Sequence, residues 1–142
     1  MLESEPYVHV ISLDFSKAFD VVDHSSLFGR LAAIPIADQV YNWLRDFFLN
    51  RAHCTKFQSK TSSQLSINAS VVQGSALGPA LFSIYTSDLS TTMPGNCLRK
   101  YADDAYMLVP ASNSTTIDTE LANVNRWCRD NKQKLKIGRA HV

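Results

Sequence analysis

Two runs with strand character, residues 97–101 (CLRKY) and 105–109 (AYMLV), flank the tripeptide Ala102-Asp103-Asp104. Aspartate is disfavoured inside strands but tolerated in turns. The spacing therefore predicts a β-hairpin with both aspartates in its turn. Because a hairpin requires antiparallel pairing, and helical patterns alternate with the strand patterns, we predict an α+β fold rather than a doubly wound parallel sheet.

The N-terminal part of the chain predicts one strand and one helix. Residues 7–13 (YVHVISL) are rich in aromatic and β-branched side chains and predict a buried strand that ends at Asp14. Residues 23–34 predict a short helix, with Asp23 or Ser25 as its N-cap, because a side-chain oxygen there can accept a hydrogen bond from an exposed backbone N–H.

A second helix and two strands are predicted next. The helix covers residues 37–50, where apolar side chains recur at helical spacing. Residues 53–58 and 65–72 predict two strands on either side of a polar turn at 59–63. The apolar face of the helix contains Val40, Tyr41, Leu44, Phe47 and Phe48.

Two more helices are predicted in the second half of the chain. Pro79 suits the first turn of a helix that continues to Leu89. A helix over residues 115–131 would begin at a capping box formed by Thr115 and Asp118. The predicted buried stripes are Leu81, Ile84, Tyr85 and Leu89 in the first of these helices, and Ile117, Leu121, Val124 and Cys128 in the second.

The composition is that of a globular chain, since 45% of its 142 residues are hydrophobic and its net charge is +1. Three widely separated cysteines fit neither a disulfide framework nor a zinc site, which favours an intracellular setting. No apolar run approaches the ~20 residues that span a bilayer. Between residues 126 and 139, six basic residues stand against one acid. A solvated helix face is the commoner reason for such a run, and contact with a nucleic-acid backbone is the alternative.

The paired aspartates admit two interpretations. The simpler one is a solvated turn. The other is a divalent-metal site, because Mg²⁺ prefers oxygen ligands and its charge offsets the repulsion between clustered carboxylates. Asp14 follows another predicted strand and would join Asp103 and Asp104 if the two strands are neighbours. Two metal ions at such a site serve in-line phosphoryl displacement.

Three segments in a fixed order favour the metal site: residues 13–24 (LDFSKAFDVVDH), 71–79 (VVQGSALGP) and 101–104 (YADD). They resemble motifs A, B and C of the reverse transcriptases of non-LTR (LINE-type) retrotransposons. Residues 127–136 (WCRDNKQKLK) resemble the approach to motif D. The resemblance implies a polymerase palm, with an antiparallel sheet and packed helices, in which fingers and thumb are largely absent. It also implies an RNA-directed DNA polymerase of the nucleus and cytoplasm that uses two Mg²⁺ (or Mn²⁺) ions, an RNA template, a DNA primer and deoxynucleoside triphosphates, without a membrane.

The resemblance implies a role for each matching residue. Asp14 and Asp103 would be the principal metal ligands, Asp104 would assist, and the backbone carbonyl of Phe15 would add a further ligand. At the incoming nucleotide it implies Lys17 and Ala18 through their backbone amides, Phe19 as a steric gate beneath the sugar, and Gln73 and Gly74 in the pocket wall, with Tyr101 and Ala102 beside the primer end.

The sequence also departs from the family pattern. Ser70, Val71 and Val72 stand where the family has Gly-Val-Pro, which puts the loop before Gln73 in doubt. The motif D lysine, expected just after Lys136, is not found, and neither are the fingers, the thumb and an endonuclease domain. We therefore expect the isolated chain to be inactive.

Residues 137–142 (IGRAHV) match one reading frame of a sequencing adapter, so we expect a non-native tail after a partial reverse transcriptase domain at residues 1–136. Two alternatives remain open for the function. One is a decayed, catalytically inert transposon remnant or nucleic-acid-binding fragment. The other is a metal-dependent nuclease or nucleotidyl cyclase, which would share the carboxylates but would not require residues 73–79 (QGSALGP).

Overall fold

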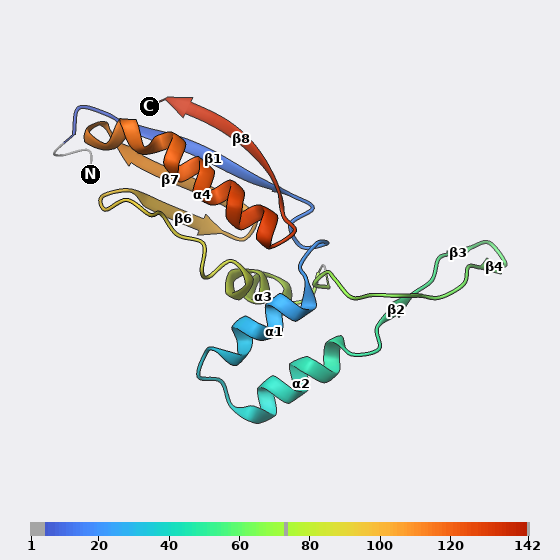
Figure 1. Cartoon of the computed structure of the whole chain (residues 1–142). Coiled ribbons are helices and arrows are strands. Elements are labelled where there is room, and N and C mark those ends of the chain that lie inside the picture. The colour runs from blue at the N-terminus through green and yellow to red at the C-terminus, as the bar shows by residue number, and fades with distance from the viewer. Residues whose placement is uncertain (1–4, 73, 142) are drawn as a thin grey trace.

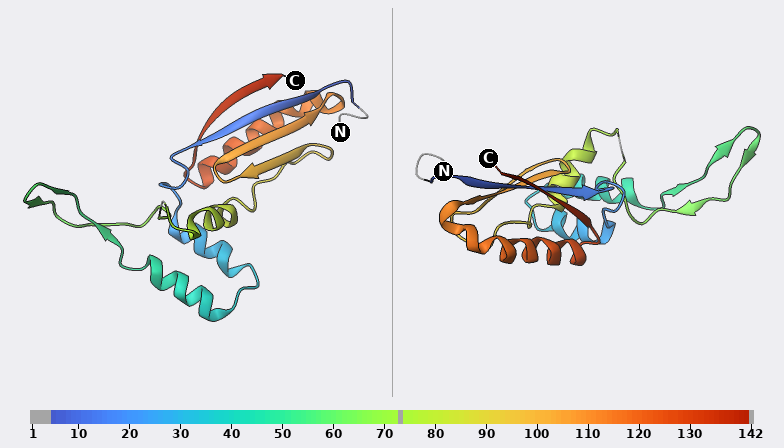
Figure 2. Two further views of the ribbon diagram at one scale, coloured as in Figure 1. Left: turned by 180° about the vertical axis from the view of Figure 1, so that it is seen from behind. Right: turned by 90° about the horizontal axis from the view of Figure 1, so that it is seen from above.

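A four-stranded antiparallel sheet lies at the centre of the computed structural model, which describes residues 5–72 and 74–141. The strand order is β6 (Cys97–Tyr101), β7 (Asp104–Pro110), β1 (Val8–Ser16) and β8 (Lys134–His141). Helix α4 (Ile117–Asp130) runs along one face of this sheet (Figures 1 and 2). The antiparallel α+β class predicted from the hairpin is confirmed.

Alternating burial along β1 and β7 shows which face of the sheet forms the core. Leu13 and Phe15 of β1 are buried, as are Met107 and Val109 of β7, and all four belong to one apolar cluster. Successive side chains of a strand point to opposite faces. Asp14, between Leu13 and Phe15, is therefore on the other face, which no helix covers in the described part of the chain (Figure 2).

Three further helices lie beyond one end of the sheet: α1 (His24–Ala32), α2 (Asp38–Phe48) and α3 (Leu77–Tyr85) (Figure 1). Asp23 is the N-cap of α1, and its side chain accepts a hydrogen bond from the backbone N–H of Ser26 at 3.0 Å. This confirms one of the two predicted caps. No helix among the described residues is long and apolar enough to cross a bilayer.

The predicted apolar helix faces are confirmed in part. In α2, Leu44 and Phe48 are buried, but Val40 is 48% exposed. Helix α3 ends at Tyr85, so Leu89 lies beyond it, although its side chain is buried as predicted.

A narrow two-stranded ribbon projects from the body (Figure 1). It consists of two short ladders, β2 (Ala52–His53) with β5 (Leu65–Ser66) and β3 (Lys56–Phe57) with β4 (Lys60–Thr61). The predicted strands were too long, and the tight turn is at residues 58–59. With both faces in water, the ribbon has no apolar surface against which longer strands could be stabilised.

The C-terminal part differs from the prediction in two ways. A 3₁₀ helix, η1 (Ala111–Thr116), precedes α4, and its last residue, Thr116, is the N-cap position of α4 without a side-chain capping bond. The predicted capping box is therefore wrong, since the 3₁₀ turn continues directly into α4. Strand β8 was not predicted, because residues 137–142 were assigned to a tail; in the structure, residues 134–141 pair with β1.

Candidate active site

The register between β1 and β7 places two of the three predicted carboxylates opposite each other. Asp14 pairs with Asp104, and both are exposed. Residues directly opposite in an antiparallel pair have Cβ atoms about 4.5–5.5 Å apart and share a face. Asp103 is the second residue of the two-residue turn between β6 and β7. Backbone pairing thus brings residues 14, 103 and 104 to one end of the sheet.

Two details of this arrangement differ from the prediction. Asp104 is the first residue of β7 rather than part of the turn, because it pairs with Tyr101 across the hairpin. Asp14 does not end its strand, since β1 continues to Ser16. The extension arises because β8 also pairs with β1 up to Ser16.

The carboxylates have the donor chemistry of a magnesium site. Among the described residues, no group of three or more His, Cys, Asp or Glu side chains is close enough to hold a metal ion. Mg²⁺, however, is usually bound by one or two carboxylates, with waters and substrate phosphates as the remaining ligands. Asp14 and Asp104 fit that requirement, and Asp103 lies next to them in the chain.

Two other acids are engaged elsewhere. The Lys132 ammonium lies 2.7 Å from Asp23, and this hydrogen bond holds the pKa of the Asp23 carboxyl below its usual value. Asp88 accepts hydrogen bonds from Arg30 at 2.8 Å and from the Trp127 indole at 2.9 Å. Burial raises the pKa of Asp88, but these bonds outweigh it and the net shift is downward. Asp23 thus joins the start of α1 to the turn between α4 and β8, and Asp88 joins the loop after α3 to α1 and α4.

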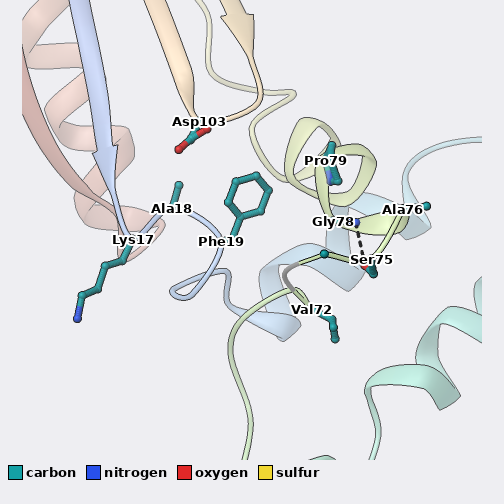
Figure 3. Close-up of a pocket in the computed structure, with 10 residues that line it drawn as sticks. Lys17, Ala18, Phe19, Val72, Ser75, Ala76, Gly78, Pro79 and Asp103 are labelled. Atoms are coloured by element: carbon teal, nitrogen blue, oxygen red, sulfur yellow. Dashed lines mark hydrogen bonds between the residues drawn. The ribbon is translucent and has the colours of Figure 1, made fainter.

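A cavity of about 670 Å³ lies beside the carboxylates (Figure 3). Its lining comes from the turn after β1, the segment before α3, the first turn of α3 and the β6–β7 turn. The lining residues are Lys17, Ala18, Phe19, Val72, Gly74, Ser75, Ala76, Gly78, Pro79 and Asp103. Segments that resemble motifs A, B and C thus border one space.

Phe19 lines this cavity. Its half-buried ring packs against Phe82 of α3, with 5.0 Å between the ring centroids. Figure 3 shows the Phe19 ring between Asp103 and the start of α3, while the Lys17 side chain extends away from the ring. The Lys17 backbone has φ of 54°, which produces the sharp turn after β1.

The backbone around Phe15 and Ala18 is already hydrogen-bonded. The Ala18 N–H donates to the Phe15 carbonyl at 3.2 Å. A carbonyl oxygen can accept a second partner, but an amide has a single proton to donate. An Ala18 contact with a triphosphate would therefore require this turn to open. The Phe15 ring points into the core, against Phe82 and Trp127.

The segment that resembles motif B is tied to the turn after β1. The Val71 N–H donates to the Phe19 carbonyl at 2.9 Å, which fixes the two segments side by side. Gln73 lies outside the described residues. Gly74 has φ of 80°, a conformation that favours glycine, and the Ser75 hydroxyl accepts a hydrogen bond from the Gly78 N–H at 3.2 Å.

The hairpin itself is exposed at its tip and anchored at its base. Tyr101 is 84% exposed, and Ala102 has φ of 52° in the two-residue turn. The Lys100 ammonium donates to the carbonyls of Thr86 and Leu89, just beyond the end of α3. A cation is favourable at the C-terminal end of a helix, so Lys100 links the carboxylate-bearing hairpin to α3.

Sequence reasoning missed two residues, of which only the first lies near the site. Lys136 pairs with Asp14 across β1 and β8, which puts the lysine on the face that carries the carboxylates. Glu120 of α4 is fully buried and accepts hydrogen bonds from the backbone N–H groups of Thr92 and Met93. The position of Glu120, four residues before Val124 in the buried stripe, was the available signal.

An antiparallel α+β fold with paired carboxylates beside a cavity is compatible with several metal-dependent classes. The family comparison separates them. The model of the reverse transcriptase (RNA-dependent DNA polymerase) family matches residues 2–138, and the chain belongs to this family. Within it, the chain is related to the reverse transcriptases of non-LTR retrotransposons.

Three relatives illustrate this relationship. The RNA-directed DNA polymerase from mobile element jockey of Drosophila funebris is 30% identical over 118 residues, or 78% of this chain. The probable RNA-directed DNA polymerase from transposon BS of Drosophila melanogaster is 25% identical over 138 residues, or 89% of this chain. The Pol polyprotein from the R2 element of Popillia japonica is 29% identical over 126 residues, or 76% of this chain. The matches cover only 13%, 15% and 21% of these relatives, respectively.

Proposed function

We propose that this chain is the palm part of an RNA-directed DNA polymerase that transfers deoxynucleotides to a primer 3′-hydroxyl. One observation carries the proposal: Asp14 and Asp104 are paired across adjacent strands, next to a cavity that Asp103 and Phe19 both line, in a chain of the reverse transcriptase family. The RNA template, the DNA primer and deoxynucleoside triphosphates are its proposed partners.

In this proposal the cavity receives the incoming nucleotide. A volume of about 670 Å³ lies in the range of pockets that hold small ligands. The Phe19 ring lies beneath the sugar and excludes a 2′-hydroxyl by steric clash. Gly74 lines the wall, and Tyr101 and Ala102 lie beside the primer end. Asp103 borders the cavity at the point where the phosphates approach.

The carboxylates of Asp14, Asp103 and Asp104 are the proposed holders of two Mg²⁺ ions. When bound, such ions increase the nucleophilicity of the primer hydroxyl and neutralise charge on the departing pyrophosphate. The role of the chain is to position: β1 and β7 fix two carboxylates in register, and Lys100 fixes the hairpin against α3. Phosphoryl transfer depends mainly on such positioning and charge compensation.

Primer extension on an RNA template tests the proposal. The assay uses a longer polypeptide in which this segment is flanked by sequence corresponding to that of its relatives. Asp14→Asn and Asp103→Asn should each lower the rate at least roughly 100-fold, because preorganised charge is lost at the reacting phosphate. Asp118→Asn, on the exposed side of α4, is the matched control and should leave the rate unchanged. Unchanged extension by both site variants would contradict the proposal.

An inert remnant is the second candidate function. It is favoured by Val72, which stands at the position of the family's proline and is 36% exposed, and by the Ala18 amide that is already hydrogen-bonded. The same assay separates the two candidates. If the longer polypeptide with all three carboxylates intact gives no extension, although it is folded and binds template, the remnant is supported.

A further inference from the structure

We propose that the projecting ribbon, residues 51–67, binds single-stranded nucleic acid at its tip, outside the cavity and the carboxylate pair. The choice of nucleic acid as partner rests in part on the polymerase role proposed above. The ribbon extends away from the sheet and helices in every view (Figures 1 and 2). It is therefore placed to contact a strand that continues beyond the body of the protein.

The ribbon has a defined shape. Its base is closed by a hydrogen bond from the Ile67 N–H to the Arg51 carbonyl at 2.8 Å, and the Arg51 guanidinium lies over the Phe47 ring of α2 at 4.8 Å. Between the two ladders, residues 54–55 face residues 62–64, so one strand has an extra residue. Such a bulge increases the twist and interrupts edge-to-edge pairing with other strands.

The charge of the ribbon favours a polyanion. Residues 51–67 include Arg51, Lys56 and Lys60 but no aspartate or glutamate, although the chain holds 13 acids. Every residue from 52 to 66 is exposed to solvent. An exposed basic segment without acids attracts phosphate groups, largely independently of sequence.

The tip adds an aromatic side chain to this charge. Phe57 is 73% exposed and pairs with Lys60 across the turn at residues 58–59. Because paired residues share a face of the ribbon, the ring and the ammonium point the same way. An exposed ring beside a cation can stack on an unpaired base and contact the adjacent phosphate, which is how many proteins bind single strands. A duplex offers no such unpaired base.

The marginal stability of the ribbon and its uncovered apolar surface also favour a binding partner. An isolated two-stranded ribbon is marginally stable in water, and Leu65, 60% exposed, adds apolar surface without cover. Contact with bases would cover this surface. The proposal therefore assigns the strongest binding contribution to Phe57 and a salt-dependent contribution to Lys56 and Lys60.

Fluorescence anisotropy with a labelled oligothymidylate and a labelled oligouridylate tests the proposal on the full 142-residue chain. The buffer contains EDTA and no triphosphate, so binding is measured independently of catalysis. Phe57→Ala should weaken binding roughly tenfold, and Phe57→Trp should retain it, because stacking requires an aromatic face. Lys60→Gln should lower the salt dependence by roughly 0.7 in the log–log slope. The matched control, Arg45→Gln on the exposed side of α2, removes one charge outside the ribbon and should leave the Phe57-dependent binding unchanged.

Two results would overturn the proposal. One is equal affinity of wild type and Phe57→Ala for both oligonucleotides, with circular dichroism showing that both are folded. The other is self-association in sedimentation experiments that Phe57→Ala abolishes without a change in oligonucleotide affinity, which would make the ribbon a contact between copies. Neither result bears on the carboxylates, since Asp103→Asn should bind the oligonucleotides as wild type does.

Discussion

Asp14 and Phe15 are neighbours in β1 with opposite environments. The Phe15 ring is buried against Phe82 and Trp127, whereas Asp14 is exposed on the face without a covering helix. The alternation of a strand produces this difference within one peptide unit. The two neighbours therefore have different roles: Phe15 anchors β1 in the core, and the Asp14 carboxylate is accessible from solvent.

Phe19 is the residue for which the proposed role is most specific. In the longer polypeptide, Phe19→Val should increase ribonucleotide incorporation and spare deoxynucleotide incorporation, because removing the ring opens space at the 2′ position. Phe19→Tyr keeps the ring and is the control that should retain selectivity. Competition between the two kinds of triphosphate in primer extension measures the effect. Unchanged selectivity in Phe19→Val would leave Phe19 as a packing residue against Phe82.

Glu120 makes folding stability depend on pH. Burial raises the pKa of its carboxyl, but hydrogen bonds from Asn96, Thr92 and Met93 outweigh burial, so the net shift is downward. A lowered native pKa stabilises the fold above the unfolded-state value of about 4.3, and this contribution is lost as the pH falls through the native pKa. Glu120→Gln should therefore reduce the free energy of unfolding by roughly 1–3 kcal/mol at pH 7 and flatten its decline in acid.

Urea denaturation across a pH series measures this contribution. Asp130→Asn, at the exposed end of α4, provides the control and should follow the wild-type pH profile. An identical acid profile for wild type and Glu120→Gln would show that the Glu120 hydrogen bonds add no pH-dependent stability.

At the scale of helices and strands, the sequence predicted those features that depend on residues close together in the chain. The β6–β7 hairpin and the cap of α1 were predicted from turn chemistry and side-chain capping, and both are confirmed. Strand β8 was not predicted, because residues 137–142 were assigned to a tail and because the strand is defined by pairing with β1 rather than by its own pattern. Asp14 likewise lies opposite Asp104 because of the register between β1 and β7. The order of the motifs in the sequence does not specify that register.

The cap of α1 gives a test at this scale. Asp23 accepts from the Ser26 N–H and also binds Lys132, so it joins the start of α1 to the turn between α4 and β8. Asp23→Ala should lower the free energy of unfolding by about 1–2 kcal/mol, as loss of an N-cap does. Ser25→Ala, in the exposed first turn, should have little effect. Thermal or urea denaturation of both variants decides between the two predicted caps, and equal destabilisation would contradict the observed one.

At the scale of the whole molecule, the chain combines a sheet with one uncovered face, a cavity at the end of that sheet and a projecting ribbon (Figures 1 and 2). The cavity is bordered by turns and by the start of α3. The fold class and the motif order were predictable from sequence. The position of the ribbon was not, because nothing local specifies the direction in which an isolated hairpin projects.

We expect the purified 142-residue chain not to extend a primer. Catalysis of this kind requires placement accurate to about 1 Å, and larger displacements cost on the order of 100-fold. The chain spans 13% of the jockey relative, so segments that could close over the nucleotide and hold the duplex would have to be supplied. Primer extension on an RNA template, with Asp103→Ala as control, measures this. Template-dependent synthesis that the control abolishes would show that the isolated chain is sufficient.

The central claim is that Asp14, Asp103 and Asp104 form one divalent-metal site. Its most direct test is Mn²⁺ binding to the 142-residue chain, followed by electron paramagnetic resonance, with Asp14→Asn, Asp104→Asn and the control Asp118→Asn. We predict weak binding by wild type, because substrate phosphates normally complete the ligand set. Each site variant should reduce the bound fraction and the control should preserve it. Equal Mn²⁺ binding by wild type and both site variants would contradict the claim.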